Sequence, residues 1–297
     1  MPAYHVEKVG QGEPLVFLPA GGFTGNEGMN IAEYLQDDYE IHMIDLPGFG
    51  RGKKHAGRCT SLDMAKWLAD YLDQEGIKVT NLVGHSLGGA LTLAFAVHFP
   101  ERVKKLLLLD QGHKSFPRIP TSEYGVFAFA FPLMNRFVQL FGRTFLKRLE
   151  PLFSGGNADE DFEMKVSQFC DQVLIKDTSY VRTALKQPSS LTAEGLQLMF
   201  GFYNLNILKL LKKVTVPTYL AYGSFENINE KERKITYKNI RKLKRKALPI
   251  EYRKVRGGHY VHWSDPTLLP DMKAFLERRG KEDEATTTSN RISETVY

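Results

Sequence analysis

The chain has 297 residues, a length that fits one large domain or a core domain carrying an insertion. Hydrophobic residues make up 42% and charged residues 25% of the sequence, which is typical of a folded globular protein and excludes disordered, collagenous and coiled-coil chains. The net charge of +6 is concentrated in residues 231–246, which hold nine Lys or Arg and one Glu, so the remainder is close to neutral and no nucleic-acid partner is indicated.

Apolar runs alternate with helical patterns along the chain, and this alternation predicts an α/β fold with a mostly parallel, twisted sheet covered by helices on both faces. The predicted strands cover residues 4–9, 15–18, 41–44, 80–83, 104–109, 217–222 and 250–255. Residues 106–109 are all leucine, as expected for a strand that is buried on both faces.

Helix signals stand between these strands. Thr60 and Asp63 form a capping pair for a helix that ends before Gly76, and small apolar residues predict a second helix over 87–99. A closing helix has Asp265 as its cap and Pro266 at its first position.

The basic segment 231–246 carries Ile235, Ile240 and Leu243 at spacings that predict a solvated helix with one buried stripe. Contact of this segment with phosphate or an anionic membrane is the alternative.

The strand pattern stops between residues 112 and 213, where aromatic helical stretches cover 124–149, 162–175 and 193–211. We interpret 112–213 as a helical insertion that divides a core domain into 1–111 and 214–280. Residues 281–297 hold too little apolar surface to fold and are expected to form a flexible tail.

No apolar run approaches the roughly 18 residues that span a bilayer, and the first residues lack the apolar region of a signal peptide. Cys59 and Cys170 have no CxxC partner, which argues against a disulfide framework or a thiolate zinc site. We therefore expect a cytoplasmic protein without an integral membrane segment. The sequence gives no indication of the oligomeric state.

The sharpest motif is Gly84-His85-Ser86-Leu87-Gly88, which follows a predicted strand and precedes a predicted helix. This Gly-x-Ser-x-Gly pattern is typical of a nucleophile elbow, where a strained turn lifts the serine hydroxyl above the sheet and the glycines let neighbouring backbone pass. The N-terminus of the following helix directs free N–H groups and a positive dipole end toward a developing oxyanion.

Two further motifs stand in the same order as in the α/β-hydrolase superfamily, which the chain resembles over residues 4–280. Residues 45–50, Asp-Leu-Pro-Gly-Phe-Gly, resemble that family's D-x-P-G-x-G loop, and Gly257-Gly258-His259 resembles its late histidine loop. The resemblance implies the α/β-hydrolase fold, with the helical insertion as a cap after the sixth strand.

A serine hydroxyl needs a base whose pKa lies near neutrality, and imidazole fits that requirement. The resemblance identifies His259 as the base rather than the nearby His262. A metal cluster of His259, His262 and Asp265 is disfavoured, because all three would lie in one flexible loop. We expect no metal and no cofactor.

A carboxylate must orient the histidine. Glu226, in Gly223-Ser224-Phe225-Glu226, resembles the family's G-x-x-D position and is the preferred acid. Asp110, at the end of the 104–109 strand, is the alternative, although it could equally be a structural cap.

The oxyanion requires backbone donors. The N–H of Leu87 is one expected donor. The second comes from the loop after the second strand, where Gly21 is preferred and Gly22 is the alternative; Pro19 has no N–H.

Aromatic residues of the insertion bury it against the core, and some of them could line an acyl pocket. They are Phe127, Phe129, Phe131, Phe137, Phe141 and Phe145.

The sequence thus predicts a serine hydrolase that cleaves a small or medium hydrophobic carboxylic ester. A lactonase, an amidase, an acyltransferase or a carbon–carbon bond hydrolase would use the same triad. A ligand receptor or regulatory binding protein that retains the triad is the hypothesis from a different class.

Overall fold

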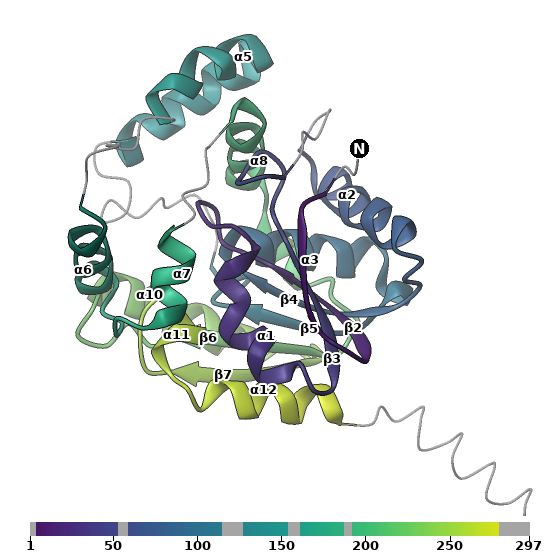
Figure 1. The fold of residues 1–297 in the computed structure, drawn as a ribbon. Coiled ribbons are helices and arrows are strands. Elements are labelled where there is room, and N and C mark those ends of the chain that lie inside the picture. Colours follow the sequence, from purple (N-terminus) through teal and green to yellow (C-terminus); the bar gives the residue numbers. More distant parts are fainter. Residues whose placement is uncertain (1–3, 53–58, 115–126, 154–160, 187–191, 279–297) are drawn as a thin grey trace, which may run out of the picture.

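The computed structural model describes residues 4–52, 59–114, 127–153, 161–186 and 192–278 (Figure 1). Its sheet has seven strands in the order β1-β3-β2-β4-β5-β6-β7, of which β1 alone is antiparallel to its neighbour. The strands are β1 (Val6–Gly10), β2 (Glu13–Leu18), β3 (Tyr39–Ile44), β4 (Thr80–His85), β5 (Val103–Leu109), β6 (Thr218–Gly223) and β7 (Ile250–Val255). Each predicted strand is present with ends that differ by at most two residues.

Helices cover both faces of this sheet. They are the 3₁₀ turns η1 (Gly25–Gly28) and η2 (Pro100–Arg102) and the helices α1 (Met29–Leu35), α2 (Ser61–Gln74), α3 (Ser86–His98), α5 (Phe127–Phe153), α6 (Phe162–Val173), α7 (Ser179–Lys186), α8 (Ala193–Asn204), α9 (Ile207–Leu211), α10 (Glu230–Leu243), α11 (Val261–Ser264) and α12 (Leu268–Glu277). None of these helices is long and apolar enough to cross a membrane.

Alternating side chains of the strands divide the core into two layers. In β2, Val16 and Leu18 face a cluster that contains α2, α3, α9 and α10, whereas Leu15 and Phe17 face a cluster that contains α1 and α12. The two-residue period of a strand therefore buries both faces of β2, as expected for the centre of a parallel sheet.

Local signals fix several helix ends. Thr60 and Asp63 form the predicted capping box at the start of α2, and Gly76 takes a φ of +69° after its last turn. The closing helix α12 begins at Leu268 rather than at Pro266. Asp265 accepts a hydrogen bond from the Thr267 N–H at 2.9 Å, so it caps a turn that precedes the helix.

The basic segment forms α10 as predicted. Ile240 and Leu243 are buried and Ile235 is half-buried, so this stripe anchors the helix to the core while its basic side chains face solvent.

The predicted insertion corresponds to α5–α9, and all regular structure described between β5 and β6 is helical. It follows the fifth strand of this sheet, whereas the resemblance implied the sixth. α6 and α7 pack on Ala20, Phe23 and Tyr260, which lie in the loops after β2 and β7. α5 lies at the periphery and packs on α8 (Figure 1). The predicted tail, 281–297, lies outside the described residues.

Candidate active site

The nucleophile elbow lies at the junction of β4 and α3. Ser86 takes a φ of +49°, a left-handed conformation that is unfavourable for a residue with a Cβ atom. The flanking glycines are required by close contact, because a Cβ on Gly84 would lie 2.4 Å from Thr92 Oγ1 and one on Gly88 would lie 2.2 Å from the Leu18 carbonyl oxygen. The Gly88 N–H donates to the Pro19 carbonyl at 2.9 Å, which joins the elbow to the loop after β2.

The predicted base, His259, forms its hydrogen bond to Asp110. Asp110 Oδ2 lies 2.7 Å from His259 Nδ1, and Asp110 itself follows β5 directly with a φ of +46°. The His259 side chain is 24% exposed, whereas the Asp110 side chain is fully buried, so the imidazole is accessible from one side only. Hydrogen bonding at Nδ1 leaves Nε2 as the atom that can exchange a proton with a substrate or a nucleophile.

Several groups stabilise Asp110 as a carboxylate. Burial alone would raise its pKa, but the Lys114 ammonium, 3.1 Å from Oδ2, and the His259 hydrogen bond lower the pKa of Asp110 to well below its ordinary value. The Gly223 N–H donates to Oδ1 at 3.0 Å. Burial and the nearby Lys114 charge also lower the pKa of His113 to about 3, so His113 is neutral beside this carboxylate.

The structure corrects the predicted pairing of His259 with Glu226. The Glu226 side chain is 47% exposed and lies 2.6 Å from Lys254 Nζ, on the surface. Phe225, which has a φ of +54°, turns inward in its place, and its ring lies 4.2 Å from Lys114 Nζ. The alternative acid, Asp110, is the carboxylate that contacts His259. Lys114 is a residue of the site that the sequence did not indicate.

The two residues whose N–H groups are the expected oxyanion donors are neighbours. Gly21 lies in a tight turn closed by the Phe23 N–H and the Ala20 carbonyl at 3.2 Å, with Gly22 at a φ of +97°. A Cβ on Gly21 would lie 3.2 Å from the Leu87 side chain, whereas Gly22 is exposed and a Cβ there would meet nothing within 4 Å. Gly21 is therefore the glycine of this turn that lies beside Leu87, and its role as the second oxyanion donor stays a prediction.

The loop after β3 supports this turn. Asp45 is 2% exposed and accepts hydrogen bonds from the Gly25 N–H at 2.8 Å and the Arg51 N–H at 2.9 Å. The aspartate of the D-x-P-G-x-G motif thus holds two loops together and lies apart from the triad.

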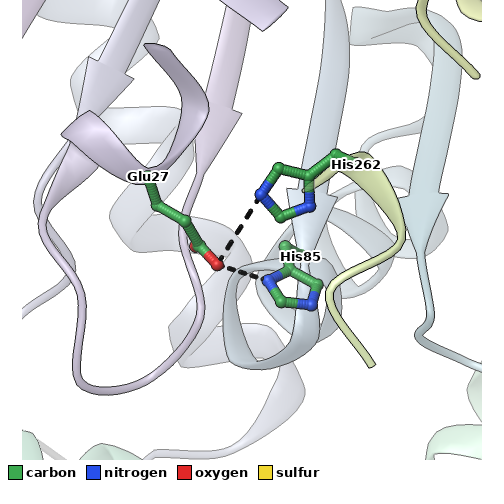
Figure 2. A group of neighbouring side chains, drawn as sticks. All are labelled: Glu27, His85 and His262. Atoms are coloured by element: carbon green, nitrogen blue, oxygen red, sulfur yellow. Dashed lines mark hydrogen bonds and ion pairs between the residues drawn. The ribbon is translucent and has the colours of Figure 1, made fainter. Parts of the chain in front are cut away.

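A second buried group includes His85 of the elbow together with Glu27 and His262 (Figure 2). Glu27 Oε2 accepts the Ala20 N–H at 2.5 Å, and Glu27 Oε1 lies 2.6 Å from His85 Nδ1. His85 Nε2 lies 3.1 Å from the His259 carbonyl oxygen, to which it donates. One chain of hydrogen bonds therefore joins the turn of residues 20–23, called the oxyanion turn below, to the elbow and to the histidine loop. No motif or spacing in the sequence indicated Glu27.

These three residues are also possible metal ligands, because their ligand atoms lie within 4.8 Å of one another. The Oε1–Nδ1 separation of 2.6 Å is a hydrogen-bond distance, whereas two ligands on one zinc ion lie about 3 Å or more apart. We therefore assign a shared proton to this pair. Of the disfavoured cluster of His259, His262 and Asp265, only His262 belongs to this buried group.

His262 is the less suitable base. It is 2% exposed, and burial followed by repulsion from His85 lowers its pKa well below the ordinary value. Its Nε2 lies 4.0 Å from Glu27 Oε1, whereas the carboxylate of Asp110 contacts His259.

The aromatic side chains that contact the loops of the site come from α6 and from the loops themselves. Phe23 packs edge-on against Phe169 at 6.0 Å and Tyr260 at 5.9 Å between ring centroids. In α5, Phe131 packs on Phe200 of α8 and Phe145 is half-buried against the same cluster, whereas Phe129, Phe137 and Phe141 are exposed. The side chain of Phe127 lies outside the described part.

Comparison with known proteins identifies a family. The family model for the alpha/beta hydrolase fold matches residues 13–266. A solved structure of E-2-(acetamidomethylene)succinate hydrolase is similar with a TM-score of 0.66 at 16% identity, covering 93% of this chain and 95% of that one. An esterase from Thermogutta terrifontis gives a TM-score of 0.61 at 20% identity, covering 92% of each chain.

Curated relatives match over a shorter region. A pimeloyl-[acyl-carrier protein] methyl ester esterase of Vibrio campbellii is 34% identical over 110 residues, 37% of this chain and 41% of that protein. A 2-hydroxy-6-oxo-6-phenylhexa-2,4-dienoate hydrolase of Comamonas testosteroni is 32% identical over 113 residues, 36% of this chain and 40% of that protein. The matched region thus spans about two fifths of these relatives.

Proposed function

The chain belongs to the α/β-hydrolase family, and on this premise we propose that it is a serine hydrolase that cleaves small or medium hydrophobic carboxylic esters through an acyl-enzyme intermediate. The observation that carries the proposal is the 2.7 Å hydrogen bond between Asp110 and His259, in a loop that His85 of the strained Ser86 elbow contacts through the His259 carbonyl at 3.1 Å. Esterases among the relatives and structural neighbours support the same reaction class.

In the acylation step, Ser86 Oγ attacks the ester carbonyl while His259 Nε2 accepts its proton. The buried Asp110 carboxylate stabilises the imidazolium that forms, and the N–H groups of Leu87 and Gly21 bind the oxyanion at the N-terminus of α3. His259 then donates the proton to the leaving alcohol. The acyl group remains on Ser86.

Deacylation repeats these roles with water as the nucleophile. His259 accepts a proton from water, the oxyanion forms again in the same site, and collapse releases the carboxylic acid and Ser86. In both steps a side chain of this protein transfers the proton, and side-chain or backbone groups stabilise the developing charges. The only partner that the reaction needs besides water is a small ester. We place this reaction in the cytoplasm, since Cys59 and Cys170 are both free thiols.

Hydrolysis of p-nitrophenyl esters of increasing acyl length tests this function. We expect multiple turnover by the wild type, and loss of both turnover and phosphonate labelling in Ser86→Ala. A folded wild type that is labelled at Ser86 but does not turn over would support a receptor instead. A wild type that is not labelled at Ser86 would contradict the elbow assignment.

Cleavage of a carbon–carbon bond in a diketone is the second candidate. It is favoured by the similarity to the hydrolase of Comamonas testosteroni described above, whose name specifies a hexadienoate substrate. Assaying ester and dienoate diketone in parallel separates the candidates, because the preferred substrate has the higher kcat/KM.

A further inference from the structure

The outer face of α5 carries an uncovered apolar stripe. Five large side chains form it, at spacings of four, four, three and one residues that place them on one side of the helix before the break at Gly142. They are Phe129, Leu133, Phe137, Leu140 and Phe141, with exposed fractions of 78%, 61%, 39%, 69% and 60%.

The opposite face of α5 is apolar as well. Phe131 is buried there and stacks on Phe200 of α8 with ring centroids 4.4 Å apart, and Leu146 and Leu149 continue this contact. A helix that is apolar on both sides is covered on both sides in its working state. α8 covers the inner face, and α5 as a whole lies at the periphery of the molecule (Figure 1).

The charged side chains of α5 distinguish between a second copy of the chain and a lipid surface as the partner of the outer face. The side chain of Arg136, on the segment that carries the stripe, and those of Lys147 and Arg148, on the segment after the break at Gly142, are exposed, and Glu150 is the one acidic residue in the sequence of the helix. A second copy packed on this stripe would bring two sets of positive charges together. An anionic lipid surface would neutralise those charges and bury the apolar side chains, which is the pattern of an interfacial amphipathic helix.

We propose that the outer face of α5 docks on an anionic membrane surface and that the enzyme takes its ester from the lipid layer. The second half of this statement rests on the proposed function, whereas the docking does not. Docking on a membrane would also bring the enzyme to its hydrophobic esters, because such esters partition into bilayers.

The docking face is connected to the catalytic machinery through α8. The N–H of Thr192, the residue that caps α8, donates to the Gly48 carbonyl at 3.2 Å. The neighbouring Phe49 is buried, and a Cβ on Gly21 would lie 3.9 Å from its ring. α8 therefore links the proposed membrane contact to the oxyanion turn.

Flotation of the full chain with lipid vesicles tests the docking. Vesicles of phosphatidylcholine with and without phosphatidylglycerol are compared, and we expect flotation with the anionic vesicles. The double variant Phe137→Ser/Leu140→Ser should bind about tenfold more weakly or worse. The double variant Lys147→Glu/Arg148→Glu should lose about fivefold or more for each basic side chain removed.

Matched controls lie on α10. Tyr237 is 69% exposed and Lys234 and Lys238 are exposed, so Tyr237→Ser and Lys234→Glu/Lys238→Glu should float as the wild type does. Loss of flotation in these variants, with retention in the α5 variants, would assign the contact to the basic helix and overturn the proposal. Absence of wild-type flotation would overturn it as well.

Light scattering tests the competing occupant. A wild-type dimer that Phe137→Ser/Leu140→Ser converts to a monomer would show that a second copy covers the stripe. Turnover of a soluble short ester checks that the α5 variants are folded, and it should be unchanged in them. Ser86→Ala should float normally, so failure of the docking and failure of the proposed reaction give different results.

Discussion

Glu27 is a fully buried acidic residue that accepts the Ala20 N–H, in the turn proposed to supply the second oxyanion donor. A free negative charge there would oppose the charge that develops on the substrate. The 2.6 Å separation from His85 Nδ1 accommodates one proton, and His85 Nε2 needs its own hydrogen to donate to the His259 carbonyl. The pair therefore carries no net charge, whichever of the two residues holds the shared proton.

Substitution of Glu27 tests whether this residue positions the oxyanion turn. In Glu27→Gln the amide oxygen can accept the Ala20 N–H and the amide nitrogen can donate to His85, so kcat should stay within a few fold of the wild-type value. Glu27→Leu leaves the Ala20 N–H without that acceptor and should lower kcat about tenfold to a hundredfold with little change in KM. Steady-state kinetics of the two variants check this. Equal kcat values in both would show that the turn is positioned without Glu27.

Two sequence motifs predicted Ser86 and His259, and the structure brings the elbow and the histidine loop together through His85. The choice between Asp110 and Glu226 could not be made in the same way, because both follow the end of a predicted strand. Backbone torsions decide it: Phe225 turns inward after β6, and Asp110 turns toward His259 after β5. Such torsions depend on tertiary contacts that a single sequence does not display.

Among the helices, the capping box at the start of α2 should make a measurable contribution to the free energy of unfolding. The Thr60 hydroxyl accepts the Asp63 N–H at 3.2 Å, and the Asp63 carboxylate accepts the Thr60 N–H at 3.0 Å. Thr60→Ala should lower the free energy of unfolding by about 1 kcal/mol. Urea denaturation measures this change, and Thr144→Ala on α5 serves as an exposed control. Equal losses in the two variants would contradict a specific effect of the cap.

Elements that bury a full face were predictable, and short ones were not. The seven strands and α2, α3 and α10 carry strong apolar periods or capping residues, whereas α7 has eight residues and was not predicted. Its buried Val181, Ala184 and Leu185 pack on the loops of the site instead of on the sheet. An element this short gains its stability from those contacts rather than from its own pattern.

At the scale of the whole molecule, buried neutral histidines make stability depend on pH. The pKa of His113 is lowered to about 3 and that of His262 is well below its ordinary value of 6.5, in both cases chiefly by burial. When the pH falls from 7 to 5, the unfolded chain binds protons at these positions and the folded chain does not. Stability should therefore fall by about 2 kcal/mol for each histidine. The contribution of Asp110 is lost only at lower pH, because its ordinary pKa is 3.8.

Urea denaturation at pH 7 and pH 5 measures this dependence. The variant His262→Leu removes one of the two groups and should reduce the loss between these pH values by about 2 kcal/mol, whatever its stability at pH 7. An unchanged loss in the variant would show that His262 is protonated in the folded protein.

The most direct test of the account is the rate at which a fluorophosphonate labels Ser86 in the wild type, Asp110→Asn and Glu226→Gln. The geometry predicts that Asp110→Asn slows labelling about a thousandfold or more, because His259 loses its orienting carboxylate, and that Glu226→Gln reacts at the wild-type rate within about twofold. Slow labelling in Glu226→Gln together with a wild-type rate in Asp110→Asn would contradict the triad of Ser86, His259 and Asp110.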